Sequence, residues 1–289
     1  MKQLPLWLAV GGCSAALLTP ARAVLPAPGA PGAAAVVDAT GDGLLEAAAR
    51  AAEALDYQGT QFVGFWSESG STSAIVEVSH VAGEGAVMRI EPTPQNPAGS
   101  VYRSGGEGAP EVVGFDPATL ALLHRNFEAA ITGSDSVAGR PTDVVAVRRP
   151  GESPVARFWL DRDTRLVLRR EVLDGDGRTL RASAFVRVSF GTARSMSPDG
   201  AERTPQVAGE RLDDAAMDEL ADDGWRLPSR LPEGVELFDA RRTGRGADEQ
   251  LHLTYSDGVS TLSLFQQRGR LDTGSLDGFR RIKVGDTGA

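Results

Sequence analysis

Residues 156–190 read ARFWLDRDTRLVLRREVLDGDGRTLRASAFVRVSF and contain three segments of alternating apolar and polar side chains. Two turn-forming stretches separate them, residues 161–164 and the DGDG run at 174–177, which has residues that tolerate positive φ at a two-residue hairpin. The third segment has a period of two, which puts one set of side chains on a single apolar face. That set is Leu180, Ala182, Ala184, Val186, Val188 and Phe190. The stretch predicts an antiparallel meander with one buried face.

Outward from this meander, the preceding sequence is rich in strand-like segments and poor in helices. An amphipathic pattern predicts a helix over 43–55, capped by Thr40 or Asp42. Only one other short helix, around residues 120–130, is predicted before the meander. The predicted strands are 59–66, 74–81, 86–91, 101–103, 111–115 and 143–148. This order favours an α+β protein with a large antiparallel sheet curved over helices.

A second, smaller unit follows the meander. Residues 199–223 are strongly acidic and include a predicted helix over 212–221, so residues 196–224 are interpreted as a connector. The small unit would span 225–289. Within it, residues 250–265 (QLHLTYSDGVSTLSLF) predict a hairpin around a Ser-Asp-Gly turn.

Composition and the N-terminus restrict the class of protein. The chain has 289 residues, a formal net charge of -9 and only two lysines, which argues against nucleic acid as a partner. Residues 1–23 combine Lys2, an apolar stretch and an Ala-Arg-Ala end, and therefore predict a signal peptide, with a flexible Pro/Ala/Gly-rich tether at 24–42. The protein is expected to be exported, to the periplasm or another extracytoplasmic location.

The only cysteine, Cys13, lies inside the predicted signal, so a chain cut after Ala23 would contain no thiol. Two alternatives stay open. In one, residues 10–13 act as a loose lipoprotein cleavage box and Cys13 is lipidated, which would make the protein membrane-associated. In the other, the apolar segment persists as an uncleaved anchor, although it is short for a span.

No catalytic or metal constellation is evident from the sequence. There is no G-x-S-x-G elbow, and His80, His124 and His252 lack the spacing of metal ligands. Asp161 and Asp163 resemble a carboxylate pair but are interpreted as solvated turn residues. We therefore predict no catalytic residue, no metal and no cofactor, and hold secreted hydrolase activity only as a remote third hypothesis.

Apolar side chains on the strands are the more informative feature. A curved antiparallel sheet can enclose an acyl chain as readily as its own helix, although most such residues belong to ordinary cores. Candidate ligand-binding residues are Phe62, Phe65, Leu166, Leu168, Val186, Val188 and Phe190. In the small unit, Trp225, Tyr255 and Phe265 are candidate partner-binding residues because aromatic side chains dominate interface energetics.

Several motifs in matching order carry a family resemblance over about residues 43–265. In the first unit they are YQGT at 57–60, VAGRP at 137–141, FWLD at 158–161 with Thr164, Leu166 and LRREVL at 168–173, and DGR at 176–178. In the second unit they are LPEG at 231–234, HLTYSDG at 252–258 and SLF at 263–265. The chain resembles the MucB/RseB family of extracytoplasmic regulators of sigma factors.

The resemblance implies a LolA-like N-terminal domain over 43–195, an open β-barrel packed on helices, followed by a smaller antiparallel-sheet domain. Members of the family bind the extracytoplasmic part of a membrane anti-sigma factor, shield it from regulated proteolysis in the stress response, and release it when a lipid or mislocalised lipoprotein binds. The alternative is a lipid or lipoprotein carrier without a sigma-factor role. One departure is that only 24 residues follow Phe265. The family usually continues into a strand, here residues 279–284, and a closing helix, so an incomplete second domain is expected.

Overall fold

The computed structural model describes thirteen stretches of the chain: residues 6–8, 40–68, 70–91, 100–103, 117–191, 209–225, 227–228, 231, 234–244, 246, 249–268, 283–284 and 287–288. The chain divides into two compact units. The larger is Ala15–Gln206, and the smaller combines Met1–Ser14 with Val207–Ala289. Most of the predicted tether and the predicted strand at 111–115 lie outside the described residues. In the described part, no helix has both the length and the apolar character to cross a membrane.

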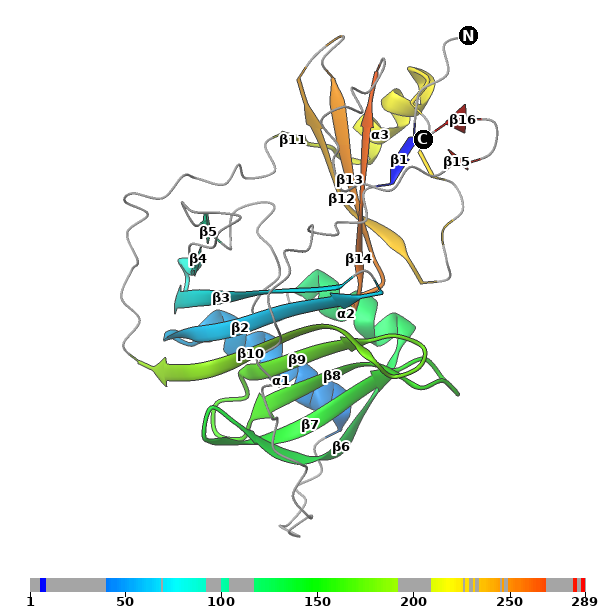
Figure 1. The fold of residues 1–289 in the computed structure, drawn as a ribbon. Coiled ribbons are helices and arrows are strands. Elements are labelled where there is room, and N and C mark those ends of the chain that lie inside the picture. Colours follow the sequence, from blue (N-terminus) through cyan, green and yellow to red (C-terminus); the bar gives the residue numbers. More distant parts are fainter. Residues whose placement is uncertain are drawn as a thin grey trace. The chain divides into compact units, whose positions relative to one another are not determined.

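The larger unit is built on one nine-stranded antiparallel sheet (Figure 1). Its order, β5-β4-β3-β2-β10-β9-β8-β7-β6, places β5 and β6 at opposite edges, so the sheet is open. The strands are β2 (Tyr57–Ser67), β3 (Gly70–Val81), β4 (Gly85–Ile90), β5 (Ser100–Arg103), β6 (Glu128–Val137), β7 (Arg140–Arg148), β8 (Pro154–Asp161), β9 (Val167–Leu173) and β10 (Thr179–Phe190). The predicted α+β, mainly antiparallel class is confirmed, as is the meander, which forms β8, β9 and β10.

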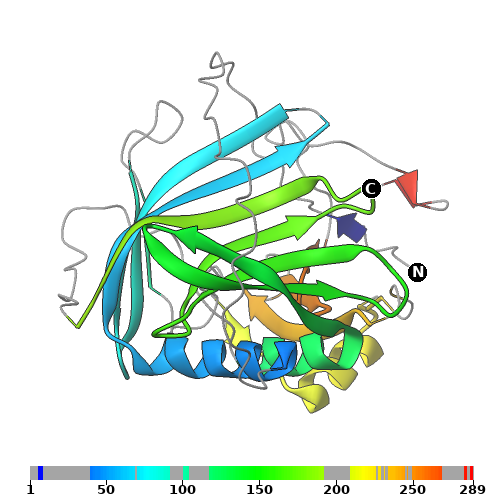
Figure 2. The same ribbon diagram turned by 90° about the horizontal axis from the view of Figure 1, so that it is seen from below.

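Two helices lie along one face of this sheet, α1 (Gly41–Ala54) and α2 (Pro117–Asn126) (Figure 2). The Thr40 side chain accepts a hydrogen bond from the Gly43 N–H at 3.1 Å, which confirms Thr40 as the N-cap. A Cβ at Gly41 would lie 2.3 Å from the carbonyl oxygen of Ala129 in β6, so this glycine lets the helix start against the sheet.

A core cluster ties the strands of the large unit to α1. Tyr57 on β2 stacks on His80 of β3 at 5.0 Å between ring centroids and meets Phe185 of β10 edge-on at 6.2 Å. His80 Nδ1 lies 2.7 Å from the Leu55 carbonyl oxygen, just beyond α1. This histidine therefore fastens the end of the helix to the sheet, as expected of a structural histidine with a single hydrogen bond.

The apolar face predicted for β10 is not continuous. A register shift between Phe185 and Arg187 marks a β-bulge in the pairing with β2. Phe185 is buried, and Val188 and Phe190 pack against the same core, whereas Leu180 and Val186 are exposed. Because the bulge adds one residue, odd-numbered side chains face the core before it and even-numbered side chains face the core after it. The prediction of a single apolar face along β10 is therefore wrong.

One helix, one strand and one turn also depart from the sequence prediction. The predicted helix around 120–130 ends at Asn126, and β6 begins at Glu128, where no strand was predicted. The turn between β9 and β10 has five residues instead of two, with Gly177 at φ +78°. In it, the Asp174 carboxylate accepts hydrogen bonds from the N–H groups of Asp176 and Arg178 at 2.9 and 2.8 Å. The side chain of Asp174 thus stabilises the longer loop.

The smaller unit is a five-stranded antiparallel sheet of order β1-β14-β13-β12-β11 (Figure 1). The elements are β1 (Leu6–Leu8), β11 (Glu210–Arg211), α3 (Asp214–Asp222), β12 (Glu236–Thr243), β13 (Gln250–Ser256) and β14 (Thr261–Gln267). The predicted hairpin is therefore present as β13 and β14. Leu220 of α3 is buried in the same core as Trp225, so α3 is part of this unit.

A two-stranded ribbon, β15 (Lys283–Val284) with β16 (Thr287–Gly288), completes the described strands. The predicted strand at 279–284 overlaps it, although residues 279–282 lie outside the described part.

Candidate functional site

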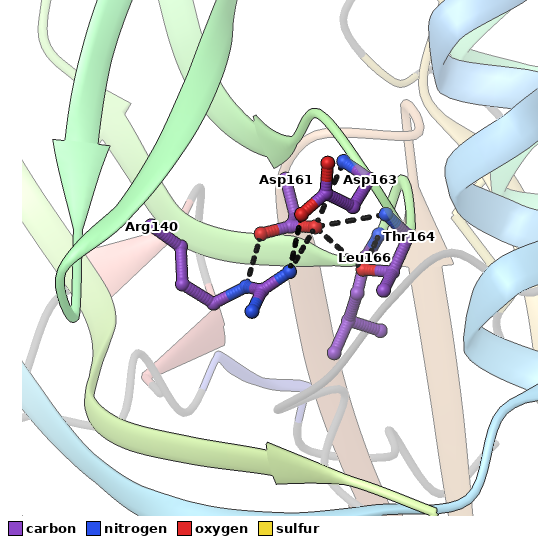
Figure 3. Close-up of polar contacts among 5 residues, drawn as sticks. All are labelled: Arg140, Asp161, Asp163, Thr164 and Leu166. Atoms are coloured by element: carbon purple, nitrogen blue, oxygen red, sulfur yellow. Dashed lines mark hydrogen bonds and ion pairs between the residues drawn. The ribbon is translucent and has the colours of Figure 1, made fainter.

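A partly buried ion pair joins Arg140 and Asp161, which lie 21 positions apart in the sequence (Figure 3). Arg140 opens β7, and Asp161 closes β8. The Arg140 guanidinium donates through Nε to Asp161 Oδ2 at 2.5 Å and through one terminal nitrogen to Oδ1 at 3.0 Å. The same nitrogen donates to Asp163 at 3.0 Å. We call Arg140, Asp161 and Thr164 the latch.

The turn after β8 completes the coordination of the Asp161 carboxylate. The backbone N–H of Thr164 donates to Oδ1 at 2.8 Å, and its hydroxyl group does so at 3.0 Å. The N–H of Asp163 adds a third contact at 3.1 Å. Because the side chain of Asp161 is fully buried, these partners replace the water that a carboxylate normally requires. The expectation that Asp161 is solvated is wrong, whereas Asp163 is 73% exposed.

The charge state of Asp161 follows from this environment. Burial by itself raises the pKa of the carboxyl group, but hydrogen bonds from Arg140 and Thr164 outweigh burial and hold the pKa below its ordinary value. Asp161 is therefore ionised at neutral pH, as a structural partner of Arg140. A general acid would need the opposite shift.

The latch also contacts the third strand of the meander. The Arg140 guanidinium lies over the ring of Phe190, 5.0 Å from its centroid, at the end of β10. On β8, Trp159 donates from Nε1 to Asp135 of β6 at 3.0 Å and is covered by Arg169 at 4.3 Å. These contacts link β6, β8, β9 and β10 at one end of the sheet. The latch therefore holds these strands in position relative to one another.

The predicted ligand-binding residues differ in their burial. Leu166 and Leu168 are buried in the core cluster with Tyr57 and Phe185, and Val188 and Phe190 pack against it. Phe62 on β2 is half-buried. Phe65 and Val186 are 44% and 63% exposed, so the seven residues do not line one continuous surface.

Exposed apolar side chains of the larger unit gather where β2 and β10 pair. Phe65 stands opposite Arg181 in this register, and the guanidinium lies 5.2 Å from the ring centroid. Trp66 and Leu180, the sequence neighbours of Phe65 and Arg181, are 39% and 42% exposed and lie on the opposite face of the sheet. We call Phe65, Trp66, Leu180 and Arg181 the rim. The predictions included only Phe65 of these four residues, because the alternation placed Leu180 on the buried face.

In the smaller unit only one of the three predicted partner-binding aromatic residues is accessible. Trp225 and Tyr255 are each 3% exposed and belong to the core, and burial raises the pKa of Tyr255. Phe265 is 45% exposed and stacks on His252 with 4.2 Å between centroids and 5° between planes. Burial lowers the pKa of His252, which favours a neutral ring under Phe265.

A charged pair borders this stack. Phe265, His252 and Arg241 are directly opposite one another on β14, β13 and β12, and so share a face of the sheet. Arg241 is almost fully buried and donates to Asp239 at 2.7 Å, and Arg211 also contacts Asp239. Within the described residues no group of three acidic, histidine or cysteine side chains could hold a metal ion.

Comparison with known proteins shows which sequences and folds this chain resembles. A family model described as the MucB/RseB N-terminal domain matches residues 93–216. The sigma factor AlgU regulatory protein MucB of Pseudomonas aeruginosa is 31% identical over 176 residues, 60% of this chain. The match covers 52% of that protein, so the chain spans about half the length of this curated relative.

Two solved structures share the fold. A crystal structure of MucB in complex with MucA(peri) has a TM-score of 0.52 at 22% identity and covers 85% of each chain. A complex of Pseudomonas aeruginosa MucA/MucB has a TM-score of 0.50 at 21% identity, covering 86% of this chain and 90% of the other.

The fold is that of a two-unit α+β protein with a large open antiparallel sheet and a smaller sheet unit. In sequence, residues 93–216 match the N-terminal domain of the MucB/RseB family and 176 residues are similar to MucB, and the fold is shared with solved MucB structures.

Proposed function

We propose that this protein is an exported regulator that binds the extracytoplasmic segment of a membrane anti-sigma factor. The observation that carries the proposal is the likeness to MucB solved in complex with MucA(peri), which extends over 85% of the chain and thus over both units. The relative in Pseudomonas aeruginosa, named as a regulatory protein of sigma factor AlgU, supports the same role. Binding, without turnover, is the activity that this role requires.

The partner surface would lie on the smaller unit around Phe265. A half-exposed aromatic ring that is held rigid by stacking on His252 loses little conformational entropy on binding, which suits an interface anchor. Trp225 and Tyr255 would contribute indirectly, by holding the sheet on which Phe265 stands.

The larger unit would sense a lipid or an acylated ligand. At its rim the exposed ring of Phe65 lies against the Arg181 guanidinium on one face of the sheet, a combination that suits an apolar chain with an anionic group. If the ligand prefers the partner-free state, linkage requires it to weaken partner binding by the same coupling free energy.

Capture from membrane extracts of the source cell tests the proposal. Residues 24–289 with a C-terminal tag should retain an anti-sigma factor, and deleting the gene should raise transcription from promoters of the cognate sigma factor. A Phe265→Asp variant should retain less of the partner. Recovery of other proteins only, with unchanged promoter activity in the deletion strain, would refute the regulator role.

A second candidate, a lipid or lipoprotein carrier, is favoured by the exposed apolar rim alone. Native mass spectrometry after mild extraction distinguishes the two roles when it is combined with the capture experiment. Bound acyl species without any anti-sigma partner indicate a carrier, whereas a captured anti-sigma factor indicates the regulator.

A further inference from the structure

The β14 edge of the smaller sheet is occupied by the N-terminus of the chain itself. β1 pairs antiparallel with β14, with Leu6 opposite Gln266, Trp7 opposite Phe265 and Leu8 opposite Leu264. All three paired residues of β1 are apolar, and both strands belong to the same compact unit.

These same residues lie in the segment that the sequence predicts to be an export signal. Cleavage after Ala23 would remove β1 and leave β14 as the edge of the sheet, next to β13. A free edge presents a row of unpaired N–H and C=O groups, which is a template for another extended chain. Proteins use such edges to bind peptides by adding a strand.

The side chains beside this edge define what would fit. Residues directly opposite each other in an antiparallel pair share a face. A residue opposite Phe265 therefore lies beside the exposed ring stacked on His252, and a residue opposite Leu264 lies on the face of the buried core. An extended segment with apolar residues at successive positions therefore suits both faces, and the sequence of β1, Leu-Trp-Leu, is of this kind.

We propose that β14 is a strand acceptor, and that in the mature protein it pairs with an extended apolar segment of the anti-sigma partner. This inference rests on the proposed function for the identity of the partner. The export signal would occupy the site until cleavage, so that the precursor binds the partner more weakly than the mature chain does.

A synthetic peptide of residues 4–10 (LPLWLAV) tests the acceptor without any partner. It should bind the chain 24–289, and hydrogen exchange should slow at the amides of β14. A scrambled peptide of the same composition, and one carrying Trp7→Asp, should bind at least tenfold more weakly. Equal binding of the three peptides, or hydrogen-exchange protection that does not include the β14 amides, would contradict the proposal that β14 accepts a strand.

A second measurement uses the captured partner. Phe265→Asp should weaken its binding at least tenfold, and the LPLWLAV peptide should compete with it. Leu237→Asp is the matched control, because Leu237 is similarly exposed (42% against 45%) but lies on β12 of the same sheet. Both variants are first checked for native circular dichroism.

The outcomes separate the two proposals. If an anti-sigma factor is captured but neither Phe265→Asp nor the peptide affects its binding, the strand pairing is wrong and the regulator role stands. If the peptide binds at β14 but no anti-sigma factor is captured, the regulator role and the assigned occupant fail, while the acceptor edge stands.

Discussion

The side chain of Asp161 contributes more to the stability of the larger unit than its position next to a turn would indicate. Its carboxylate is completely buried and accepts hydrogen bonds from Arg140, from the Thr164 hydroxyl group and from two backbone N–H groups. Removing one partner of such a pair costs more than the pair contributes, because the remaining charge is left without compensation.

Asp161→Asn should therefore lower the free energy of unfolding by about 3 kcal/mol. The amide keeps the shape of the side chain but removes the charge that Arg140 faces. Asp163→Asn is the control, since Asp163 is 73% exposed and its contact with the same guanidinium should contribute less than about 1 kcal/mol. Urea denaturation of the three proteins measures both effects, and equal losses for the two variants would contradict the latch.

Acid should remove the contribution of Asp161. The folded-state pKa of this carboxyl group lies below its unfolded value, so the unfolded chain takes up the proton more readily and protonation favours unfolding. The stabilisation is complete above the unfolded pKa of about 3.9 and declines as pH falls below that value. The difference between wild type and Asp161→Asn, followed by denaturation from pH 7 to pH 3, should be constant above about pH 5 and then shrink. If the stability difference between the two proteins stayed constant down to pH 3, ionisation of Asp161 would not be the source of the stabilisation.

At the scale of elements, the β-bulge in β10 determines which side chains enter the core. Next to the bulge, Gly59 of β2 pairs with Val188, and an added Cβ there would lie 2.3 Å from the Arg187 carbonyl oxygen and 2.9 Å from the Phe185 ring. Gly59 thus provides the space into which the Phe185 ring packs beside Tyr57.

Gly59→Ala should accordingly destabilise the protein by about 1–3 kcal/mol, because the ring and the bulged strand must both shift. Gly133→Ala in β6 is a matched strand control, since no atom lies within 4 Å of its added Cβ. Thermal unfolding should show a lower midpoint for the first variant only. A neutral Gly59→Ala would mean that Phe185 does not depend on this glycine.

The same elements show what a sequence can predict. The meander and the β13–β14 hairpin were predictable because alternation and turn residues are local signals. The β10 bulge was not, because it depends on the neighbouring strand and leaves the alternation intact. β6 was missed since EAAITGSDSV lacks a clear period of two.

The candidate site was harder to predict than the strands. The burial of Asp161 depends on Arg140, which is distant in sequence, although both residues lie in the motifs that carry the family resemblance. For Trp225 and Tyr255, the residue type indicated an interface, but the packing of Leu220 from α3 in their core decides their burial. Only Phe265 kept an exposed ring.

At the scale of the whole molecule, the two units have separate cores. Trp159 is buried with Leu166 and Phe185 in the large one, and Trp225 is buried with Tyr255 in the small one. The two described clusters share no residue, so each unit contains the apolar contacts that a cooperative transition needs.

This separation provides two internal reporters of unfolding. In one variant of the chain 24–289, Trp159 is the only tryptophan kept, and in the other it is Trp225, with the remaining ones changed to phenylalanine. Asp161→Asn should then lower the urea midpoint seen by Trp159 and leave the midpoint seen by Trp225 unchanged, because the latch lies entirely within the larger unit. Phe265→Asp, an exposed position, should leave both midpoints nearly unchanged. If Asp161→Asn lowered both midpoints equally, the two units would unfold as one cooperative unit. A ligand that stabilises the larger unit would then also stabilise the smaller one.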